Sequence, residues 1–490
     1  MSNPPLTPVV ESAPPTNLSA RRFGELVFIL CLLPILAAML LTSLFEPFWE
    51  YEQLLFGALA VAGLAWLVSV QIARAGGGSL AVIVVGAICL RAIVLVGPTS
   101  LSDDLYRYVW EGELVASQTS PYAYAPEAPE LAAQRERLPE VFARMNNTDI
   151  SAAYPPAVQL VFAATTSVAK LVQDPPESSG PFAMRILFAL CDLLVLWPLI
   201  ALLRRFKLPP SLSVVWAWNP LIALEFAGSG HFDSLGILLF VAALSILTLP
   251  STMRPQGIRA RLFDAFGTSL LSAAILVKFL PICIVPFVLR GAFLRRSFFL
   301  LLSSAALIAP FAFFDGAASG LTRGISEYGV RWESFHFVYG WIEWIPEQLF
   351  GGERDLSPTD PRIVARGFIA LVWCVVGLFL FAQTRNTLRA ATVLIGLFLV
   401  LTPTLHPWYL AWIAPFVALK PRASWLWVLL VGPALYVPLR LWKTEGVWTQ
   451  PEWLWPVVAV PFLVFTLVEW RSDFSFRRRA HQQAATAKIA

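Results

Sequence analysis

Apolar stretches of about 20 residues recur along the whole chain and are separated by short clusters of basic residues. A stretch of this length is what an α-helix needs to cross the roughly 30 Å hydrocarbon core of a bilayer. Composition agrees, because 57% of the residues are hydrophobic and only 14% are charged. Soluble domains carry roughly 25% charged residues. The sequence therefore predicts an all-α polytopic membrane protein.

Charge and cysteine usage exclude several other classes. The net charge of +4 is modest, and the basic residues lie between apolar stretches, where they act as topology signals rather than as a nucleic-acid surface. The five cysteines stand singly inside apolar stretches, without CxxC spacing. We therefore expect no nucleic-acid partner, no disulfide framework and no zinc site.

The basic clusters also predict the topology, since cytoplasmic loops collect Lys and Arg. Residues 1–20 are polar and Pro-rich and predict a disordered cytoplasmic tail, and the basic segment 472–490 predicts a second one. Residues 21–471 predict a single transmembrane domain with about 14 spanning helices. We expect an inner or plasma membrane location, with both termini in the cytoplasm and with residues 98–153 and 315–366 as two outer loops.

Three local features of this topology are further expectations. The stretch 154–172 is predicted as a re-entrant or surface-lying helix, because a crossing there would move the basic cluster near 204–207 to the outside; the sequence leaves open whether it spans. Two half-length helices, 265–277 and 279–290, are expected around Lys278. Arg91, and Arg185 with Asp192, are costly within a membrane and are expected to form internal pairs.

Two neighbouring carboxylates, Asp103 and Asp104, follow the third apolar stretch in the segment SLSDDLYRYVWEG. One aspartate can cap a helix, which leaves the other free. A carboxylate beside a like charge near lipid headgroups is expected to have a raised pKa, suited to accepting a proton from a hydroxyl. We therefore favour a catalytic or metal-binding role over capping alone, and the sequence leaves open which aspartate is the base. Arg107, Tyr108 and Glu111 lie on the helix that follows.

Other polar residues, far apart in sequence, are predicted at the same outer ends of helices. They are His231 and Asp233 after two glycines, Lys278 before a proline, and His406 and Tyr409 in LHPWYLAW. Lone residues of these kinds are often structural, but so many at one membrane boundary predict a single polar site. Arg331, in an outer loop rich in aromatic residues, and Tyr154 complete the predicted set.

These segments, taken in order, resemble the bacterial GT-C fold glycosyltransferases that use polyprenyl-phosphate sugars, especially the mannosyltransferase-like branch. The matching segments are DDLYRYVWEG, SPYAYAP, YPP, WNPLIALEFAGSGHFD, LVKFLPICIVP and LHPWYLAW, within residues 98–415. The resemblance implies a GT-C-like bundle with amphipathic helices on its outer face. It also implies a catalytic domain in which Asp103 or Asp104 is the general base or contacts a metal.

The resemblance and the residues together predict transfer of a hexose, with mannose favoured, at the extracytoplasmic face. A polyprenyl-phosphate sugar would be the donor, and a glycan, lipid or protein the acceptor, in an inverting displacement. Arg107, Tyr108, Glu111, Tyr154, His231, Asp233, Lys278, Arg331, His406 and Tyr409 are the predicted substrate-binding residues. Mg²⁺ or Mn²⁺ bridging Asp103, Asp104 and the phosphate is left open. The alternatives are a lipid or glycan transporter or flippase, and a polymerase or ligase of lipid-linked glycans.

Overall fold

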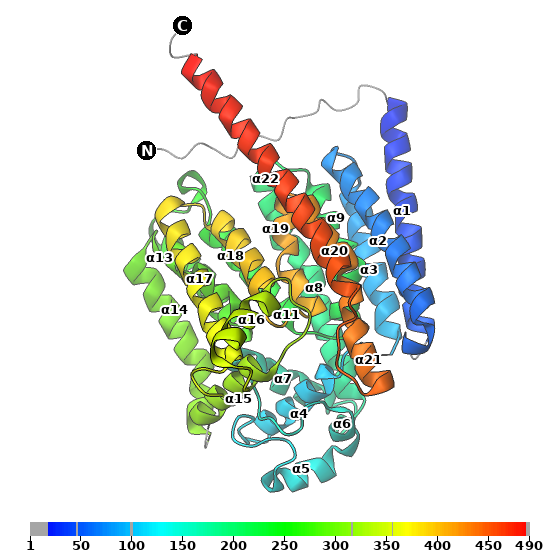
Figure 1. Cartoon of the computed structure of the whole chain (residues 1–490), viewed down its shortest axis with the longest axis vertical. Helices are drawn as coiled ribbons and strands as arrows, with labels where there is room; N and C mark the ends of the chain where they lie inside the picture. The colour runs from blue at the N-terminus through cyan, green and yellow to red at the C-terminus, as the bar shows by residue number, and fades with distance from the viewer. Residues whose placement is uncertain (1–17, 46–47, 99–100, 315–316, 355, 487–490) are drawn as a thin grey trace.

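The computed structural model describes residues 18–45, 48–98, 101–314, 317–354 and 356–486. Within these ranges all regular secondary structure is helical, as the composition predicts. The predicted N-terminal tail lies almost wholly outside the described residues. Figure 1 shows long helices side by side in a bundle, with a group of short helices, α4 to α7, at one end. We call this the α4 end.

Eight of the described helical segments are long and apolar enough to cross a membrane, or up to nine if a bent pair is counted as one span. The protein is therefore a multi-pass membrane protein. The eight segments are Arg22–Leu44, Phe48–Arg74, Ser179–Arg205, Gly257–Val277, Phe293–Phe313, Pro361–Gln383, Ala423–Glu445 and Leu454–Asp473.

Shorter apolar helices account for much of the difference from the predicted number of spans. They are Leu80–Val96, Pro156–Ala169, Leu280–Leu289, Thr387–Leu401 and Pro407–Leu419, and the bent pair is Pro220–Gly228 with Asp233–Leu247. An α-helix rises about 1.5 Å per residue, so none of these alone covers a 30 Å core. The figure of about 14 spans stays a prediction.

The helices have the following bounds. The longer ones are α1 (Leu18–Leu44), α2 (Glu52–Arg74), α3 (Leu80–Val96), α8 (Ser179–Arg205), α11 (Asp233–Leu247), α12 (Gly257–Val277), α14 (Phe293–Ile308), α17 (Pro361–Gln383), α18 (Thr387–Leu401) and α22 (Leu454–Thr486). The shorter ones in the bundle are α9 (Val214–Ala217), α10 (Pro220–Ala223), α13 (Val285–Leu289), α19 (Ala414–Leu419), α20 (Ala423–Val431) and α21 (Val437–Glu445).

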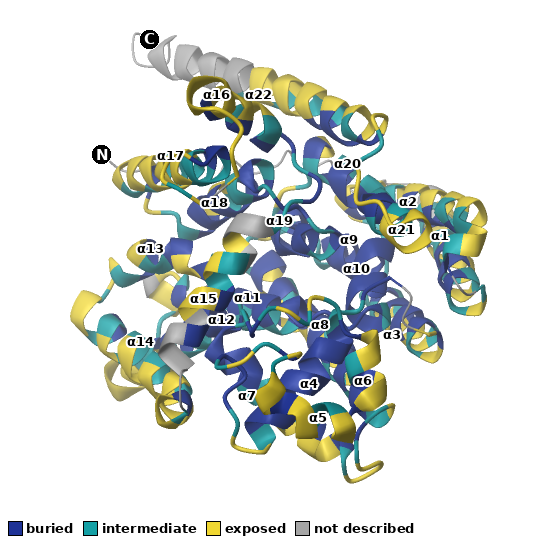
Figure 2. Cartoon of the chain, turned by 60° about the horizontal axis from the view of Figure 1, so that its bottom comes forward, coloured by how far each residue is buried: buried dark blue, intermediate teal, exposed yellow. Residues whose placement is uncertain are grey.

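The first predicted outer loop is a compact helical layer. It contains α4 (Asp104–Ala116), α5 (Ala132–Arg137) and α6 (Pro139–Arg144), and α4 packs against α7 (Pro156–Ala169). Figure 2 shows that α4 is largely buried whereas α5 is exposed at the surface. At 14 residues, α7 is too short to span the membrane alone.

The second predicted outer loop contains α15 (Ala317–Arg331) and α16 (Tyr339–Phe350), joined by an irregular segment. This joining segment, residues 332–338, pairs with the loop after α18, because Ser334 N donates to Pro403 O (3.2 Å) and Leu405 N donates to Phe335 O (2.8 Å). The second loop therefore lies beside the segment that carries His406.

Two expectations about the bundle were wrong. α12 is one full-length helix, Gly257–Val277, so only the following segment, Leu280–Leu289, is short. Asp192 pairs with Arg91, whose Nε lies 2.7 Å from Oδ2, and not with Arg185. Arg185 instead donates to the carbonyl oxygens of Ala227 and Val94. Helical spacing predicts neighbours on one helix but not contacts from another.

Candidate functional site

The turn between α10 and α11 places two ionisable residues inside the α4 end of the bundle. After α10 the backbone widens into a π-helix, Leu224–Gly228, and the chain bends by 116° before α11 begins. Gly230 makes this bend possible, because its φ of +70° is a left-handed conformation and a Cβ there would lie 2.8 Å from Leu105 Cδ1. Glu225 and His231 on the two sides of the bend are both fully buried.

His231 is the centre of the polar site. Its Nδ1 faces α4, where it lies 3.4 Å from the Tyr108 hydroxyl and 3.9 Å from Asp104 Oδ2. Its Nε2 faces the π-helix and lies 3.4 Å from Glu225 Oε2. The imidazole thus stands between two carboxylates from different elements.

Glu225 has a further partner from the C-terminal half of the chain. The Tyr436 hydroxyl, from the segment before α21, donates to Glu225 Oε2 at 2.8 Å. The other carboxylate oxygen, Oε1, is buried without a hydrogen-bond partner among the described residues. Leaving such an oxygen unsatisfied costs on the order of 1–3 kcal/mol, so it needs an explanation beyond packing.

Three aromatic rings are stacked beside this line of side chains. The Trp408 indole lies between two imidazoles, with ring centroids 3.9 Å from His231 and 4.4 Å from His406 and interplanar angles of 20° and 6°. An indole face attracts a cation. Trp408 therefore fixes the orientation of the two imidazoles.

Lys278 extends the site from the end of α12. Its Nζ lies 2.8 Å from Asp233 Oδ1 and 4.1 Å from the centroid of the Tyr409 ring. Trp412 Nε1 also donates to Asp233 Oδ1, at 2.7 Å, so the carboxylate is held in place. The Lys278 side chain keeps 22% of its surface exposed. It is therefore a cation that a substrate can reach.

The two aspartates at the start of α4 have different surroundings. Asp103 is the N-cap residue but makes no capping hydrogen bond; its Oδ1 accepts from Lys443 Nζ of α21 at 2.9 Å. Asp104 Oδ1 accepts from Asn146 Nδ2 at 3.1 Å, and its Oδ2 faces His231. Asp104, not Asp103, therefore adjoins the His231 group.

Burial raises the pKa of Asp104 above its ordinary value, and the adjacent charge of Asp103 adds to the rise. The hydrogen bond from Asn146 and the positive charges of Arg107 and Lys278 oppose it. A raised pKa makes a carboxylate a better proton acceptor near neutral pH. The influence of Lys278 also shows that the lysine and Asp104 act within one electrostatic environment.

Arg107 and Glu111 form an ion pair on α4. Arg107 Nε lies 2.8 Å from Glu111 Oε1, and the guanidinium donates to the carbonyls of Asn147 and Ile150. Glu111 Oε2 accepts from Gln159 of α7 at 2.6 Å. These side chains join α4 to α7 and to the loop that carries Asn146. Their predicted role in binding substrate stays a prediction.

Tyr154 and Tyr409 lie at the border of the site. The Tyr154 ring packs edge-on against Tyr108 and Phe232, with centroids 5.4 and 5.2 Å away. Tyr409 packs edge-on against His406 at 5.6 Å. The predicted role of both tyrosines in binding substrate stays a prediction. The side chain of Arg331 lies outside the described residues.

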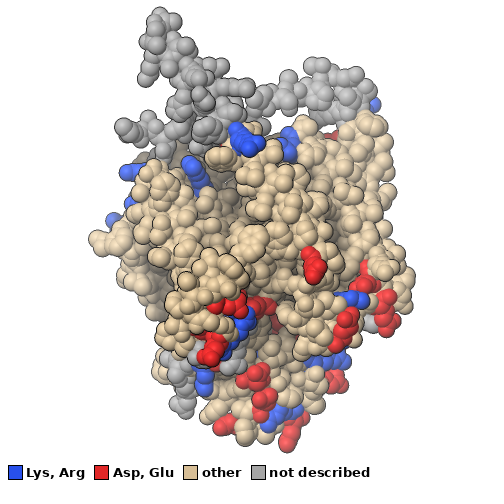
Figure 3. Space-filling view, viewed as in Figure 1, with Lys and Arg blue, Asp and Glu red and all other residues tan. Residues whose placement is uncertain are grey.

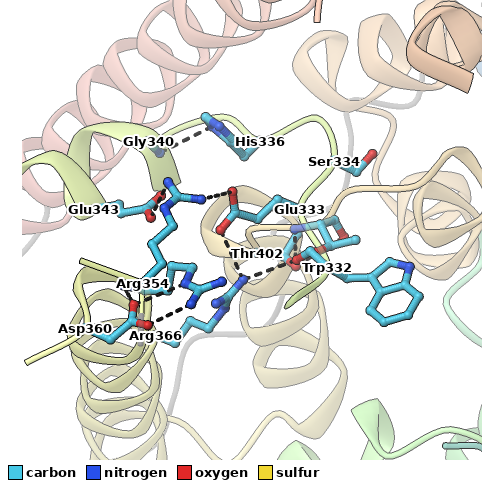
Figure 4. Close-up of polar contacts among 12 residues, drawn as sticks. Trp332, Glu333, Ser334, His336, Gly340, Glu343, Arg354, Asp360, Arg366 and Thr402 are labelled. Carbon is cyan, nitrogen blue, oxygen red and sulfur yellow. Dashed lines mark hydrogen bonds and ion pairs between the residues drawn. The ribbon is translucent and has the colours of Figure 1, made fainter. Parts of the chain in front are cut away.

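A second polar cluster adjoins the loop that leads to His406. Glu333 lies between Arg354 and Arg366, with N to O distances of 3.7 and 3.5 Å, and Arg354 also contacts Glu343 at 3.2 Å (Figure 4). Arg366 donates to the Trp332 carbonyl. This cluster fastens the 332–338 segment over the 402–405 loop, and its acidic and basic groups neutralise one another.

A Mg²⁺ or Mn²⁺ ion bridging Asp103, Asp104 and a phosphate stays a prediction. Among the described residues no group of three or more His, Cys, Asp and Glu side chains is arranged to hold a metal ion. Asp103 and Asp104 are also committed to different partners, Lys443 and Asn146. A Mg²⁺ ion requires near-octahedral oxygen ligands. In proteins this ion often takes one or two carboxylates, with water and a substrate phosphate as the other ligands.

Several residues of the site were not selected from the sequence. They are Glu225, Asn146, Trp408, Trp412, Tyr436 and Lys443. Glu225 has no sequence signal for the π-helix that buries it. The spacing of Trp408 and Trp412 after the HP dipeptide was available as a signal, because it places both on one side of a helical turn. No local pattern indicates that Tyr436 and Lys443 approach α4.

None of the curated proteins and none of the solved structures compared matches the chain significantly. A family model described as the alpha-(1->6)-mannopyranosyltransferase N-terminal domain, MptA_B family, matches residues 35–293. This range exceeds half of the chain and contains Asp104, Glu225, His231 and Lys278. The chain therefore belongs to this family of GT-C type mannosyltransferases, and it is a membrane glycosyltransferase that moves mannose from a sugar donor to an acceptor.

Proposed function

We propose that the protein transfers mannose from a polyprenyl-phosphate donor to an acceptor hydroxyl at the extracytoplasmic face, with Asp104 as the general base. The observation that carries the proposal is the meeting of Asp104, His231 and Lys278 at one end of a membrane bundle. They supply a proton acceptor and a reachable cation, which transfer from a sugar phosphate requires.

Asp104 Oδ2 accepts the proton of the acceptor hydroxyl as that oxygen attacks C1 of the sugar. The raised pKa of Asp104 matches this task. The C1–O bond to phosphate breaks as the new C1–O bond forms, through a transition state with oxocarbenium character. A single displacement inverts C1, so an alpha-linked product requires a donor of β configuration.

Lys278 stabilises the departing phosphate. Its ammonium is held by Asp233 and Tyr409 but remains partly exposed, so it faces the phosphate without reorganisation. Removing one well-placed donor of this kind typically costs about 2.7–4 kcal/mol of barrier. His406, next to Trp408, is the second group that we assign to phosphate binding.

The distribution of charge supports the extracytoplasmic assignment. Basic clusters follow α2, α8 and α11 at the end of the bundle opposite the α4 end, and loops of this kind are cytoplasmic. Figure 3 shows Lys and Arg prevailing at that end of the visible face, whereas acidic and basic residues mix near the α4 end. A lipid-linked donor would then enter from the outer leaflet.

The test compares donors. Membranes containing the protein are supplied with radiolabelled polyprenyl-phosphate mannose of β or α configuration, or with a nucleotide-linked mannose, together with an α-mannoside acceptor. We expect incorporation only from the β-linked polyprenyl donor, and formation of an alpha-(1->6) linkage. Incorporation from the nucleotide sugar alone would overturn the donor assignment.

A sidedness measurement tests the membrane face. A single cysteine introduced at exposed Glu130, in the first outer loop, is treated with a membrane-impermeant maleimide in intact cells. Labelling is expected before lysis. Labelling only after lysis, with the same variant still active, would overturn the extracytoplasmic assignment.

A further inference from the structure

Asp104, His231, Glu225 and Tyr436 form one continuous line that crosses the interface between the two halves of the chain. The contacts along it are 3.9 Å from Asp104 Oδ2 to His231 Nδ1, 3.4 Å from His231 Nε2 to Glu225 Oε2, and 2.8 Å from Glu225 Oε2 to the Tyr436 hydroxyl. Only Asp104 is partly exposed; the His231 and Glu225 side chains have no exposed surface.

We propose that His231 receives the proton that Asp104 takes from the acceptor, and that buried Glu225 is the positioning residue that enables His231 to do so. This inference rests on the proposed function. It assigns a role to Glu225, a residue that does not itself contact the substrate.

The proposal requires one tautomer of the imidazole. The neutral ring would carry its proton on Nε2, which lies 3.4 Å from Glu225 Oε2, and would present the lone pair of Nδ1 toward Asp104 and the Tyr108 hydroxyl. Transfer from Asp104 Oδ2 to Nδ1 then gives an imidazolium. Glu225 on one side and the Trp408 face on the other stabilise its charge.

The proton and the electron pair of the broken bond are both accounted for within one turnover. The acceptor loses its hydroxyl proton to Asp104 and forms the new bond to C1, while the electron pair of the broken C1–O bond stays with the phosphate. His231 holds the proton while the phosphate departs. Asp104 then transfers this proton from His231 to the phosphate monoester. The distance of 3.9 Å exceeds that of a hydrogen bond, and catalytic contacts commonly tighten when substrate binds.

A purely structural carboxylate would be expected to use both of its oxygens. Asp192, equally buried in α8, does so, because Oδ2 and Oδ1 each accept from Arg91, at 2.7 and 3.1 Å. Glu225 has no arginine or lysine partner among the described residues, and its Oε1 has no hydrogen bond there. The neighbours of Glu225 in this line are therefore an imidazole and a hydroxyl rather than a permanent cation.

Several titratable groups surround this line and contribute to any pH dependence. From α4 they are Asp103, Asp104, Arg107 and Tyr108; from the other elements they are Tyr154, Asp233, Lys278, His406 and Tyr436. Asp104 and Glu225 repel one another when both are ionised. Removing the charge of Glu225 therefore lowers the pKa of Asp104.

The experiment measures mannosyl transfer against pH for the full-length protein and for Glu225→Gln, at equal amounts of monodisperse protein. We expect Glu225→Gln to lower kcat about 10–100-fold, the range typical for loss of an orienting partner, with the donor KM unchanged. The acidic limb of its pH profile is expected at lower pH than in the unmodified protein. Glu225→Asp, which keeps the charge, is expected to recover part of kcat and of the limb position.

Asp192→Asn is the matched control, because it neutralises an equally buried carboxylate outside the site. It is expected to reduce the yield of folded protein without moving the acidic limb. An unchanged kcat and limb in Glu225→Gln would overturn the inference, as would a loss of kcat with an unmoved limb and no recovery by aspartate. Failure of the unmodified protein to use polyprenyl-phosphate mannose would overturn the proposed function instead.

Discussion

Two buried polar groups in this bundle have opposite characters. In the bundle interior, Arg91 and Asp192 satisfy one another, and the remaining Arg91 nitrogen donates to the Ala217 carbonyl. At the α4 end, Glu225, His231 and Asp233 are equally buried, yet each retains a polar atom without a hydrogen bond among the described residues. In the first group each side-chain nitrogen and oxygen has a hydrogen-bond partner. In the second group the atoms without a partner can still bind a proton or a ligand.

The comparison teaches how to separate structural from functional charge in a membrane protein. Both kinds are rare and expensive within apolar surroundings. A structural pair exhausts its donors and acceptors, because an unsatisfied polar atom would only destabilise the fold. A functional group keeps some of them available and has a path to the surface, here through Asp104 and Lys278.

The largest expected effect is on stability, at Asp192. Replacement by asparagine leaves the Arg91 charge buried without a counter-ion, which typically costs about 3–5 kcal/mol. We expect a clear fall in the midpoint of thermal aggregation in detergent and in the folded yield, with little change in activity per folded molecule. A stable Asp192→Asn protein with lost activity would break the distinction drawn above.

The next effect is catalytic, at Lys278. Lys278→Met removes the cation assigned to the phosphate and is expected to lower kcat/KM for the lipid donor about 100- to 1000-fold. Steady-state rates at several donor concentrations measure it. Lys207→Met, in the turn after α8 outside the site, serves as the control, and an equal loss in both variants would contradict the assignment.

A smaller effect concerns pH dependence at Asp104. The hydrogen bond from Asn146 lowers the pKa of Asp104, so Asn146→Ala is expected to raise that pKa further. The active form is the carboxylate, which is lost as the pH falls through its pKa. The acidic limb of the kcat/KM profile should therefore move to higher pH in Asn146→Ala. A limb that stays in place would show that another group controls it.

The smallest effect is expected at Lys443. Its bond to Asp103 joins two partly exposed side chains, and such pairs contribute about 0.2–1 kcal/mol. Lys443→Met should therefore change the thermal midpoint and the transfer rate only slightly. A loss as large as that of Lys278→Met would place Lys443 and Asp103 in the catalytic group.

Much of this architecture follows from sequence patterns, for reasons that are local. Apolar stretches and basic clusters predict the helical membrane bundle, since both depend only on residues near one another in the chain. The predicted grouping of Asp104, His231, Lys278 and His406 follows from the same topology, because it places their helix ends on one side of the membrane.

Contacts between distant elements could not be predicted in this way. The partners of Asp192 and Glu225 come from other parts of the chain, Arg91 and Tyr436. The separate environments of Asp103 and Asp104 depend on α21 and on the loop before α7. A single sequence carries no periodicity that reports such packing, and the π-helix at Glu225 has no local signature.

The most direct test of the central claim compares Asp104→Asn with Asp103→Asn. Mannosyl transfer from the polyprenyl-phosphate donor is measured in membranes containing equal amounts of each protein. Loss of a general base typically lowers the rate about 100- to 10,000-fold, and we expect this for Asp104→Asn but only a minor loss for Asp103→Asn. Full activity in Asp104→Asn would contradict the account.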